Sequence, residues 1–150
     1  MRVLVAYDGS PAADAAIDQI VARPWSEGTR VRVVTVVETQ LFYPLANGIE
    51  VYPPISEKIR AAMRENAYRG VQSAVAKLKA KPGIEPSYDL REGDVKSALL
   101  EAIREWKADL VIVGSHGKGA LGRFFLGSVS HTLVTHAPCN VEVVRPTAIA

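Results

Sequence analysis

The sequence predicts an open, doubly wound α/β fold, in which five parallel strands form a sheet with helices on both faces. The first observation is that short segments rich in β-branched residues alternate with longer segments of helical apolar spacing. The second is size, because 150 residues with 48% apolar and 23% charged residues make about one ordinary domain, spanning 1–150, with a single core. Right-handed crossovers then make a doubly wound sheet the simplest arrangement.

The strands are predicted from β-branched character, and the helices from apolar residues spaced three and four apart. Ser10 and Pro11 supply an N-cap and a first-turn proline for the first helix. Ile17, Ile20 and Val21 share one face of that helix. The predicted strands cover residues 2–7, 30–38, 85–91, 109–113 and 141–145, and the predicted helices cover 11–22, 55–79, 95–107 and 127–136.

The helix at 95–107 has the plainest amphipathic pattern. Asp94 can cap it, and its apolar face holds Val95, Ala98, Leu99, Ala102, Ile103 and Trp106. The segment from Glu38 to Pro54 instead mixes aromatic residues with proline and glycine, so it is interpreted as an ordered excursion. It could fold over a ligand, or it could be a surface loop whose aromatic residues cover the adjacent helix.

A glycine-rich loop joins the strand pattern at 109–113 to the helix pattern at 127–136. Gly114-Ser115-His116-Gly117 is followed, after nine residues, by Gly127-Ser128. Glycines let the backbone approach a ligand closely or take positive φ, and the next helix directs its unpaired N–H groups outward. Ser128 and Ser130 add hydroxyl donors, so the junction suits a phosphate. Ala120 and Leu121 stand where the Walker A pattern has Lys and Ser or Thr, so this is a different nucleotide loop.

The spacing G-x-x-G, nine residues, G-S resembles the nucleotide signature of the ATP-binding branch of the universal stress protein family. Val3 to Ser10 and Pro138 to Arg145 are similar to that family's first and last strands, so the resemblance covers nearly the whole chain. It implies a Rossmann-like fold that binds ATP as its cofactor, with room for a Mg²⁺ ion. It also implies that the loops after the first and fourth strands face one ligand crevice.

The resemblance implies a set of nucleotide-binding positions. Asp8 would accept a hydrogen bond from the adenine amine or a sugar hydroxyl, although Asp-Gly-Ser is also ordinary turn chemistry. Ala6, Tyr7, Val36 and Val113 would shape the adenine and ribose pocket. The phosphate positions would be Gly114, Gly117, Gly127, Ser128, Val129 and Ser130.

Other reactive side chains give weaker signals. His116 could donate to phosphate or remain a solvated loop residue, and His131 and His136 are spaced too far apart to share a helical face as metal ligands. The G-x-G-x-x-G match from Gly117 to Gly122 lies too late in the chain for a dinucleotide fingerprint. Cys139 is expected to be a small buried side chain without chemistry.

Catalysis has less support than binding, because the sequence contains neither a G-x-S-x-G elbow nor a Cys-His pairing signal. Lys118 and Arg123 could neutralise phosphate charge, but this does not establish hydrolysis. The leading hypothesis is therefore an ATP-binding, nucleotide-dependent stress-response module. One alternative is an enzyme, either a slow ATPase or adenine-nucleotide hydrolase or a protein that phosphorylates itself. The other is a nucleotide-free dimeric scaffold.

The partners expected are an adenine nucleotide and a second copy of the chain. A net charge of +2 with interspersed signs gives no reason to expect nucleic acid, and no apolar stretch is long enough to span a membrane. Without a secretory pattern at Met1, the cytoplasm is the expected compartment. In the resembled family the last strands of two copies pair, which implies a homodimer through 141–145. Asn140 and Glu142, where the family commonly has apolar residues or Pro, weaken that assignment.

Overall fold

The computed structural model describes residues 1–39, 43–44, 48, 50–51, 54–117 and 126–147. The strands of the main sheet are β1 (Arg2–Ala6), β2 (Thr29–Glu38), β5 (Ile84–Gly93), β6 (Leu110–Gly114) and β7 (Asn140–Val144). The helices are α1 (Pro11–Ala22), α2 (Glu57–Lys79), α3 (Val95–Trp106) and α4 (Ser128–His136). Two-residue strands β3 (Tyr43–Pro44) and β4 (Glu50–Val51) pair antiparallel with each other.

The main sheet has the strand order β5-β2-β1-β6-β7, and all of its neighbouring strands run parallel. The chain first builds outward from β1 to β5 and then crosses back to β6 and β7. This is the doubly wound arrangement that the sequence predicts, with a reversal of strand order between β1 and β6. The element bounds differ from the prediction by two residues or fewer, and β5 is the most extended relative to its predicted range.

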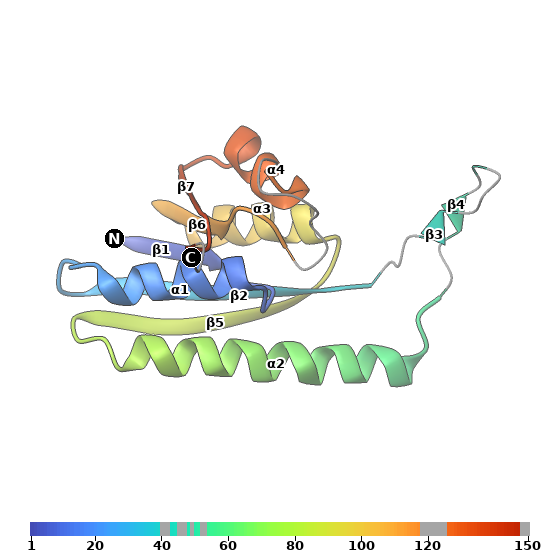
Figure 1. The fold of residues 1–150 in the computed structure, drawn as a ribbon, viewed down its shortest axis with the longest axis horizontal. Coiled ribbons are helices and arrows are strands. Elements are labelled where there is room, and N and C mark those ends of the chain that lie inside the picture. Colours follow the sequence, from blue (N-terminus) through green and yellow to red (C-terminus); the bar gives the residue numbers. More distant parts are fainter. Residues whose placement is uncertain (40–42, 45–47, 49, 52–53, 118–125, 148–150) are drawn as a thin grey trace.

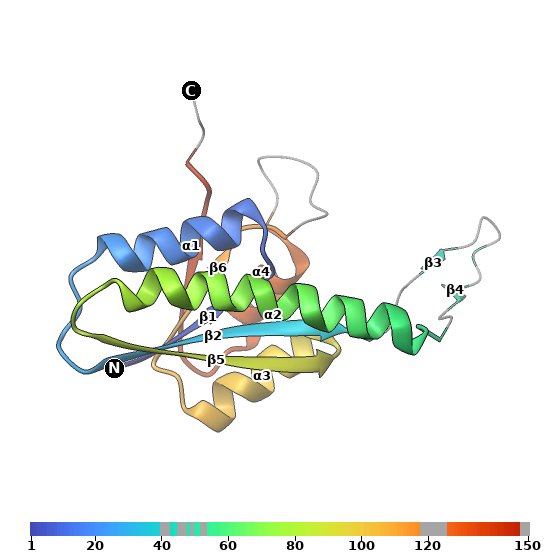
Figure 2. The ribbon, with the colours of Figure 1, turned by 90° about the horizontal axis from the view of Figure 1, so that it is seen from below.

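Two apolar clusters lie on opposite faces of the sheet. Val3, Val5 and Tyr7 pack with α1 and α2 on one face, which we call the α1/α2 face. Leu4 and Ala6 pack with α3 and α4 on the other, the α3/α4 face. Figure 1 shows α2 and the α3–α4 pair on opposite sides of the strands, and Figure 2 shows α1 and α2 side by side. The alternation of strand side chains therefore decides which residues each helix pair covers.

Local side chains define where the helices begin. The Ser10 hydroxyl accepts a hydrogen bond from the Ala13 N–H at 3.2 Å, and the Asp94 carboxylate accepts one from the Ser97 N–H at 2.8 Å. Both predicted caps are therefore confirmed. The bond from Ser97 stabilises the ionised form and lowers the pKa of Asp94. Within the described part of the chain, no helix is both long and apolar enough to cross a membrane.

The predicted excursion at 38–54 is described only in part. Phe42 and Tyr52, two of the aromatic residues that suggested it, lie outside the described residues. The described strands β3 and β4 lie away from the sheet, beyond the N-terminal end of α2, in both views (Figures 1 and 2). The described part of this segment therefore does not cover the end of the sheet where the two loops meet.

Gly70 lies in the interior of α2, where a glycine lowers helix stability. A Cβ added there would meet the Tyr7 ring at 3.5 Å, an ordinary van der Waals distance, so packing leaves room for alanine. We expect Gly70→Ala to raise the free energy of unfolding by about 0.5–1 kcal/mol. Urea denaturation measures the change, and a destabilised variant would contradict the packing described here.

Candidate functional site

The parallel pairing of β1 with β6 brings two distant loops together. Ala6 at the end of β1 lies opposite Val113 near the end of β6, so the segments that follow both strands leave the same edge of the sheet. A cavity of about 1010 Å³ lies there, at the upper end of the range for ligand pockets. All the predicted site residues line it, namely Ala6, Tyr7, Asp8, Val36, Val113, Gly114, Gly117, Gly127, Ser128, Val129 and Ser130.

The start of α4 offers the cavity a row of backbone donors. Gly127 is the N-cap and provides no side-chain cap, and its own N–H donates to the Ser115 carbonyl at 2.7 Å. The N–H groups of Ser128, Val129 and Ser130 have no hydrogen-bond partner among the described residues. These groups and the positive end of the helix dipole together favour an anion.

The Ser130 side chain closes the loop instead of facing a ligand. This residue is only 1% exposed, and its hydroxyl lies 3.1 Å from the Ser115 carbonyl oxygen and 2.9 Å from that of Gly127. A hydroxyl has one proton, so these two acceptors share it. The sequence suggested Ser130 as a hydroxyl donor to phosphate, and the structure corrects this to a bond within the protein. The hydroxyl of the exposed Ser128 is not held in such a bond.

Packing within the protein explains the loop glycines better than backbone flexibility does. None of Gly114, Gly117 and Gly127 has positive φ. A Cβ on Gly114 would lie 2.8 Å from the Ala12 carbonyl carbon, and one on Gly127 would lie 3.1 Å from the Cα of His116. The first distance is one that real Cβ atoms essentially never show, so Gly114 allows α1 to approach β6.

The sequence left two roles open for Asp8, a turn residue and a hydrogen-bond acceptor for a ligand, and the structure is compatible with both. Its Oδ1 accepts a hydrogen bond from the Ser10 N–H at 2.9 Å, which stabilises the turn before α1. Its Oδ2 faces the glycine loop, because a Cβ on Gly117 would lie 2.8 Å from that oxygen. The side chain is exposed and lines the cavity, so one oxygen holds the turn while the other faces the space beside Gly117.

Side chains on the α3/α4 face form an apolar wall of the cavity. Ala6, Val36, Leu99, Val113 and Val129 belong to one apolar cluster and line the cavity together, and we call them the apolar arm. A flat apolar group such as a purine ring fits a wall of this kind. The predicted residues Ala6, Val36 and Val113 are therefore brought together by the fold.

Tyr7 does not belong to that wall. It continues the alternation of β1 and packs on the α1/α2 face, where its hydroxyl donates to Asp14 Oδ1 at 2.8 Å. Burial raises the pKa of the phenol, and the hydrogen bond to the Asp14 carboxylate raises it further. The sequence grouped Tyr7 with Ala6, but neighbouring residues of an extended chain point to opposite faces.

Sequence reasoning missed the cavity residues contributed by α1, α2 and α3. Val95 and Leu99 come from α3, Asp14 from α1, and Asn66, Gly70 and Ser73 from α2. Apolar periodicity identifies a helix face but not which turn of the helix reaches the end of a sheet. The helix-interior Gly70 was the one available signal.

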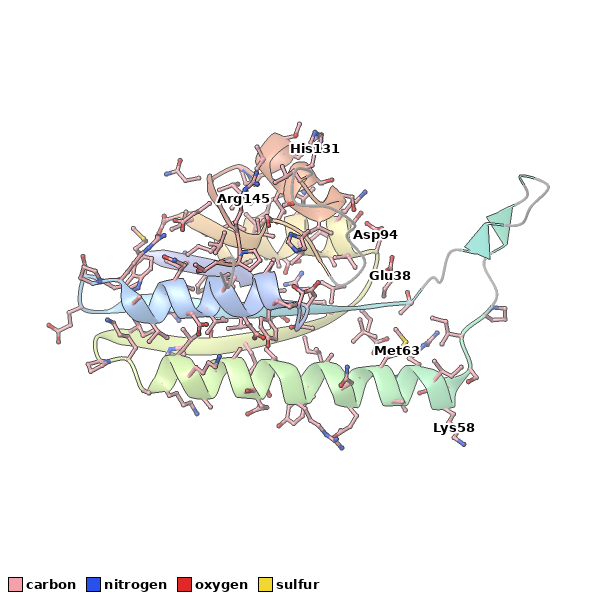
Figure 3. All side chains as sticks on the ribbon, in the orientation of Figure 1. Glu38, Lys58, Met63, Asp94, His131 and Arg145 are labelled. Atoms are coloured by element: carbon pink, nitrogen blue, oxygen red, sulfur yellow. The ribbon has the colours of Figure 1, made fainter. Side chains whose placement is uncertain are left out.

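The other candidate residues have partners or positions of their own. The His116 Nδ1 lies 2.9 Å from the Ser115 hydroxyl, and its half-buried ring lines the cavity. His131 lies on the outer side of α4 (Figure 3), and the described residues contain no cluster suited to a metal ion. Cys139 is half-buried, less than the sequence suggested, and burial raises the pKa of its thiol. The segment 118–125, with Lys118, Gly122 and Arg123, lies outside the described residues.

Comparison with known proteins identifies the family. The model of the universal stress protein family matches residues 1–145. The chain belongs to the universal stress protein family. A relative from Thermus aquaticus, named as a universal stress protein, is 32% identical over 149 residues, which cover 95% of this chain and 97% of that protein. The family resemblance that the glycine loop suggested therefore extends over almost the whole chain.

Solved structures of the family share the fold. The universal stress protein UspA from Lactobacillus plantarum superposes with a TM-score of 0.79 at 22% identity, over 97% of each chain. An Arabidopsis thaliana family protein described with AMP bound has a TM-score of 0.67 at 18% identity, over 99% of this chain and 93% of that one. A universal stress protein in complex with cAMP has a TM-score of 0.67 at 20% identity, over 98% of each chain.

The glycine contacts predict different effects of two alanine substitutions. Gly114→Ala places its Cβ against the backbone of Ala12, which cannot move without shifting α1, so we expect a loss of about 1–3 kcal/mol in unfolding free energy. Gly117→Ala meets only the end of the exposed Asp8 side chain and should stay within about 0.5 kcal/mol of wild type. Urea denaturation of both variants measures the difference, and equal losses would contradict this assignment.

Proposed function

We propose that the cavity binds ATP and that this chain is a nucleotide-dependent stress-response module of its family. The observation that carries the proposal is the set of three partnerless N–H groups at the start of α4, which open onto the same cavity as the apolar arm. Phosphate is the group best matched to such donors. The AMP and cAMP complexes of proteins with this fold support an adenine nucleotide.

The proposed placement follows the chemistry of the walls. The adenine ring would lie in the apolar arm, and the phosphates would accept from the N–H groups of Ser128, Val129 and Ser130. The free oxygen of Asp8 would then meet either a ribose hydroxyl or the phosphates. Carboxylate and phosphate repel each other unless a cation lies between them. In the placement that brings the phosphates beside it, Asp8 would share a Mg²⁺ ion with them through Oδ2, since Mg²⁺ takes one or two carboxylates together with phosphate oxygens.

Nucleotide binding is tested most directly on Gly117→Val. Its side chain would occupy the space between Asp8 and the loop, where the phosphates must pass, and should weaken ATP binding by more than tenfold. Calorimetric titration with ATP and magnesium measures this after bound nucleotide has been removed and identified by mass spectrometry. Helical circular dichroism should match wild type. If the variant binds ATP with wild-type affinity, the glycine loop is not the phosphate site. If the wild-type protein does not bind ATP, the proposed function is wrong.

We also propose that the protein is a homodimer through β7. This strand lies at the end of the strand order, so within the described part of the chain one of its edges has no partner strand and can pair with a second copy. Glu142 forms an ion pair with Arg23 of the same chain, which neutralises the charge that would oppose a close approach. We expect light scattering on a sizing column to give twice the chain mass of 16.2 kDa at micromolar concentration. A mass of one chain at all concentrations would contradict the dimer.

A further inference from the structure

The cavity continues past the strand ends onto the other face of the sheet. There it is lined by Tyr7, Asp14, Asn66, Gly70 and Ser73, which we call the α1–α2 arm. Tyr7 belongs to the core of the α1/α2 face, opposite the apolar arm. Figure 2 shows α1 and α2 running beside each other, and in Figure 3 Met63, another lining residue, points from α2 toward the end of β2 where Glu38 lies. The proposed nucleotide leaves this arm without an assigned occupant.

The α1–α2 arm offers hydrogen-bond acceptors and neutral polar groups. The Asp14 carboxylate accepts from the buried Tyr7 hydroxyl, which fixes its orientation, and among the described residues no cation pairs with it. The two cations that line the cavity near this arm are already paired, Arg69 with Glu65 and Lys77 with Asp18. A further phosphate would therefore be repelled here, whereas hydroxyl donors would be accepted.

Gly70 keeps this arm wide. A glycine in a helix interior costs about 1 kcal/mol relative to alanine, and neither positive φ nor a close contact requires one here. A larger side chain would project into the cavity beside Tyr7. The residue thus lowers helix stability and leaves open space next to an oriented carboxylate.

We propose that the α1–α2 arm binds a second, hydroxyl-rich sugar that is joined through the phosphates to the bound adenine nucleotide. The ligand class is the nucleoside diphosphate sugars, with adenosine in the apolar arm, and the inference rests on the proposed function. Asp14 accepts the sugar hydroxyls, as acidic residues accept ribose hydroxyls in dinucleotide-binding folds. The Asn66 amide and the Ser73 hydroxyl, both exposed at the rim, complete a set of polar groups suited to a sugar. The phosphate donors of α4 and the loop after β1 line the same cavity as the two arms.

The test compares ADP-ribose with ADP by calorimetry. ADP-ribose differs from ADP in its terminal ribose and in one negative charge, because its β-phosphate is a diester. The β-methyl ester of ADP has the diester charge without the sugar and is the reference for this difference. Wild-type protein should bind ADP-ribose about tenfold more tightly than ADP and than this ester, the effect of one or two hydrogen bonds to a charged group. Asp14→Asn should remove most of this preference while leaving ADP affinity unchanged, because the amide oxygen still accepts from Tyr7. Glu101→Gln is the charge-matched control, since Glu101 is exposed on α3 and does not line the cavity.

A second variant tests the space instead of the charge. Gly70→Leu should fill the arm and weaken ADP-ribose binding at least tenfold, with ADP affinity within twofold of wild type. Gly70→Ala serves as the folded reference, because its single methyl group fits beside Tyr7.

The outcomes separate the two proposals. If ADP binds but ADP-ribose binds no more tightly, or if Glu101→Gln acts as strongly as Asp14→Asn, the sugar-binding arm is overturned while the nucleotide site stands. If neither ATP nor ADP binds the wild-type protein, the proposed function fails, and the inference fails with it.

Discussion

At the end of β6, α1 packs so closely that the site of a Cβ on Gly114 falls 2.8 Å from the backbone of Ala12. This contact, together with the register that pairs Ala6 with Val113, fixes the distance between the loop after β1 and the loop after β6. Asp8 can face Gly117 only because both loops are held at this separation. The position of the cavity thus depends on the strand order and on one glycine contact, and these two features place its polar groups.

The charges that line the cavity do not favour the binding of small anions in general. Among the described residues, its partnerless backbone N–H groups lie at one helix end, and the cations Arg69 and Lys77 are paired with Glu65 and Asp18. The side chains of Asp8, Asp14 and Glu38 along the same cavity are acidic. A small anion would find few favourable partners beyond the start of α4. A nucleotide carries phosphate acceptors and hydroxyl or amine donors in one molecule, so it can satisfy both kinds of wall at once.

Most of the fold could be predicted from the sequence, because the alternating strand and helix patterns, the helix caps and the rule of right-handed crossovers all indicate the same arrangement. Ser10 and Asp94 are examples in which one side chain and its distance from the apolar run fix a helix start. The parts of the site that were missed depend on longer-range geometry. The alternation of side chains continues past the end of β1, so Tyr7 lies on the face opposite the apolar arm. The need for glycine at position 114 follows only from the close packing of α1 against β6. The Ser130 hydroxyl was misassigned because its acceptors, the carbonyls of Ser115 and Gly127, are brought near it only by the folded loop.

Different parts of helix α2 pack in the core and line the cavity. Its buried residues, Val71, Ala74, Val75 and Leu78, all lie in the C-terminal part. The turns before them hold Asn66 and Gly70 at the cavity, and Ile59 is 51% exposed. A helix of 23 residues can carry this arrangement because its buried C-terminal part packs against the core of the sheet. Gly70 lowers the stability of the helix while it leaves open space at the cavity, which is the pattern expected where the cavity, and not helix formation, determines the local residue.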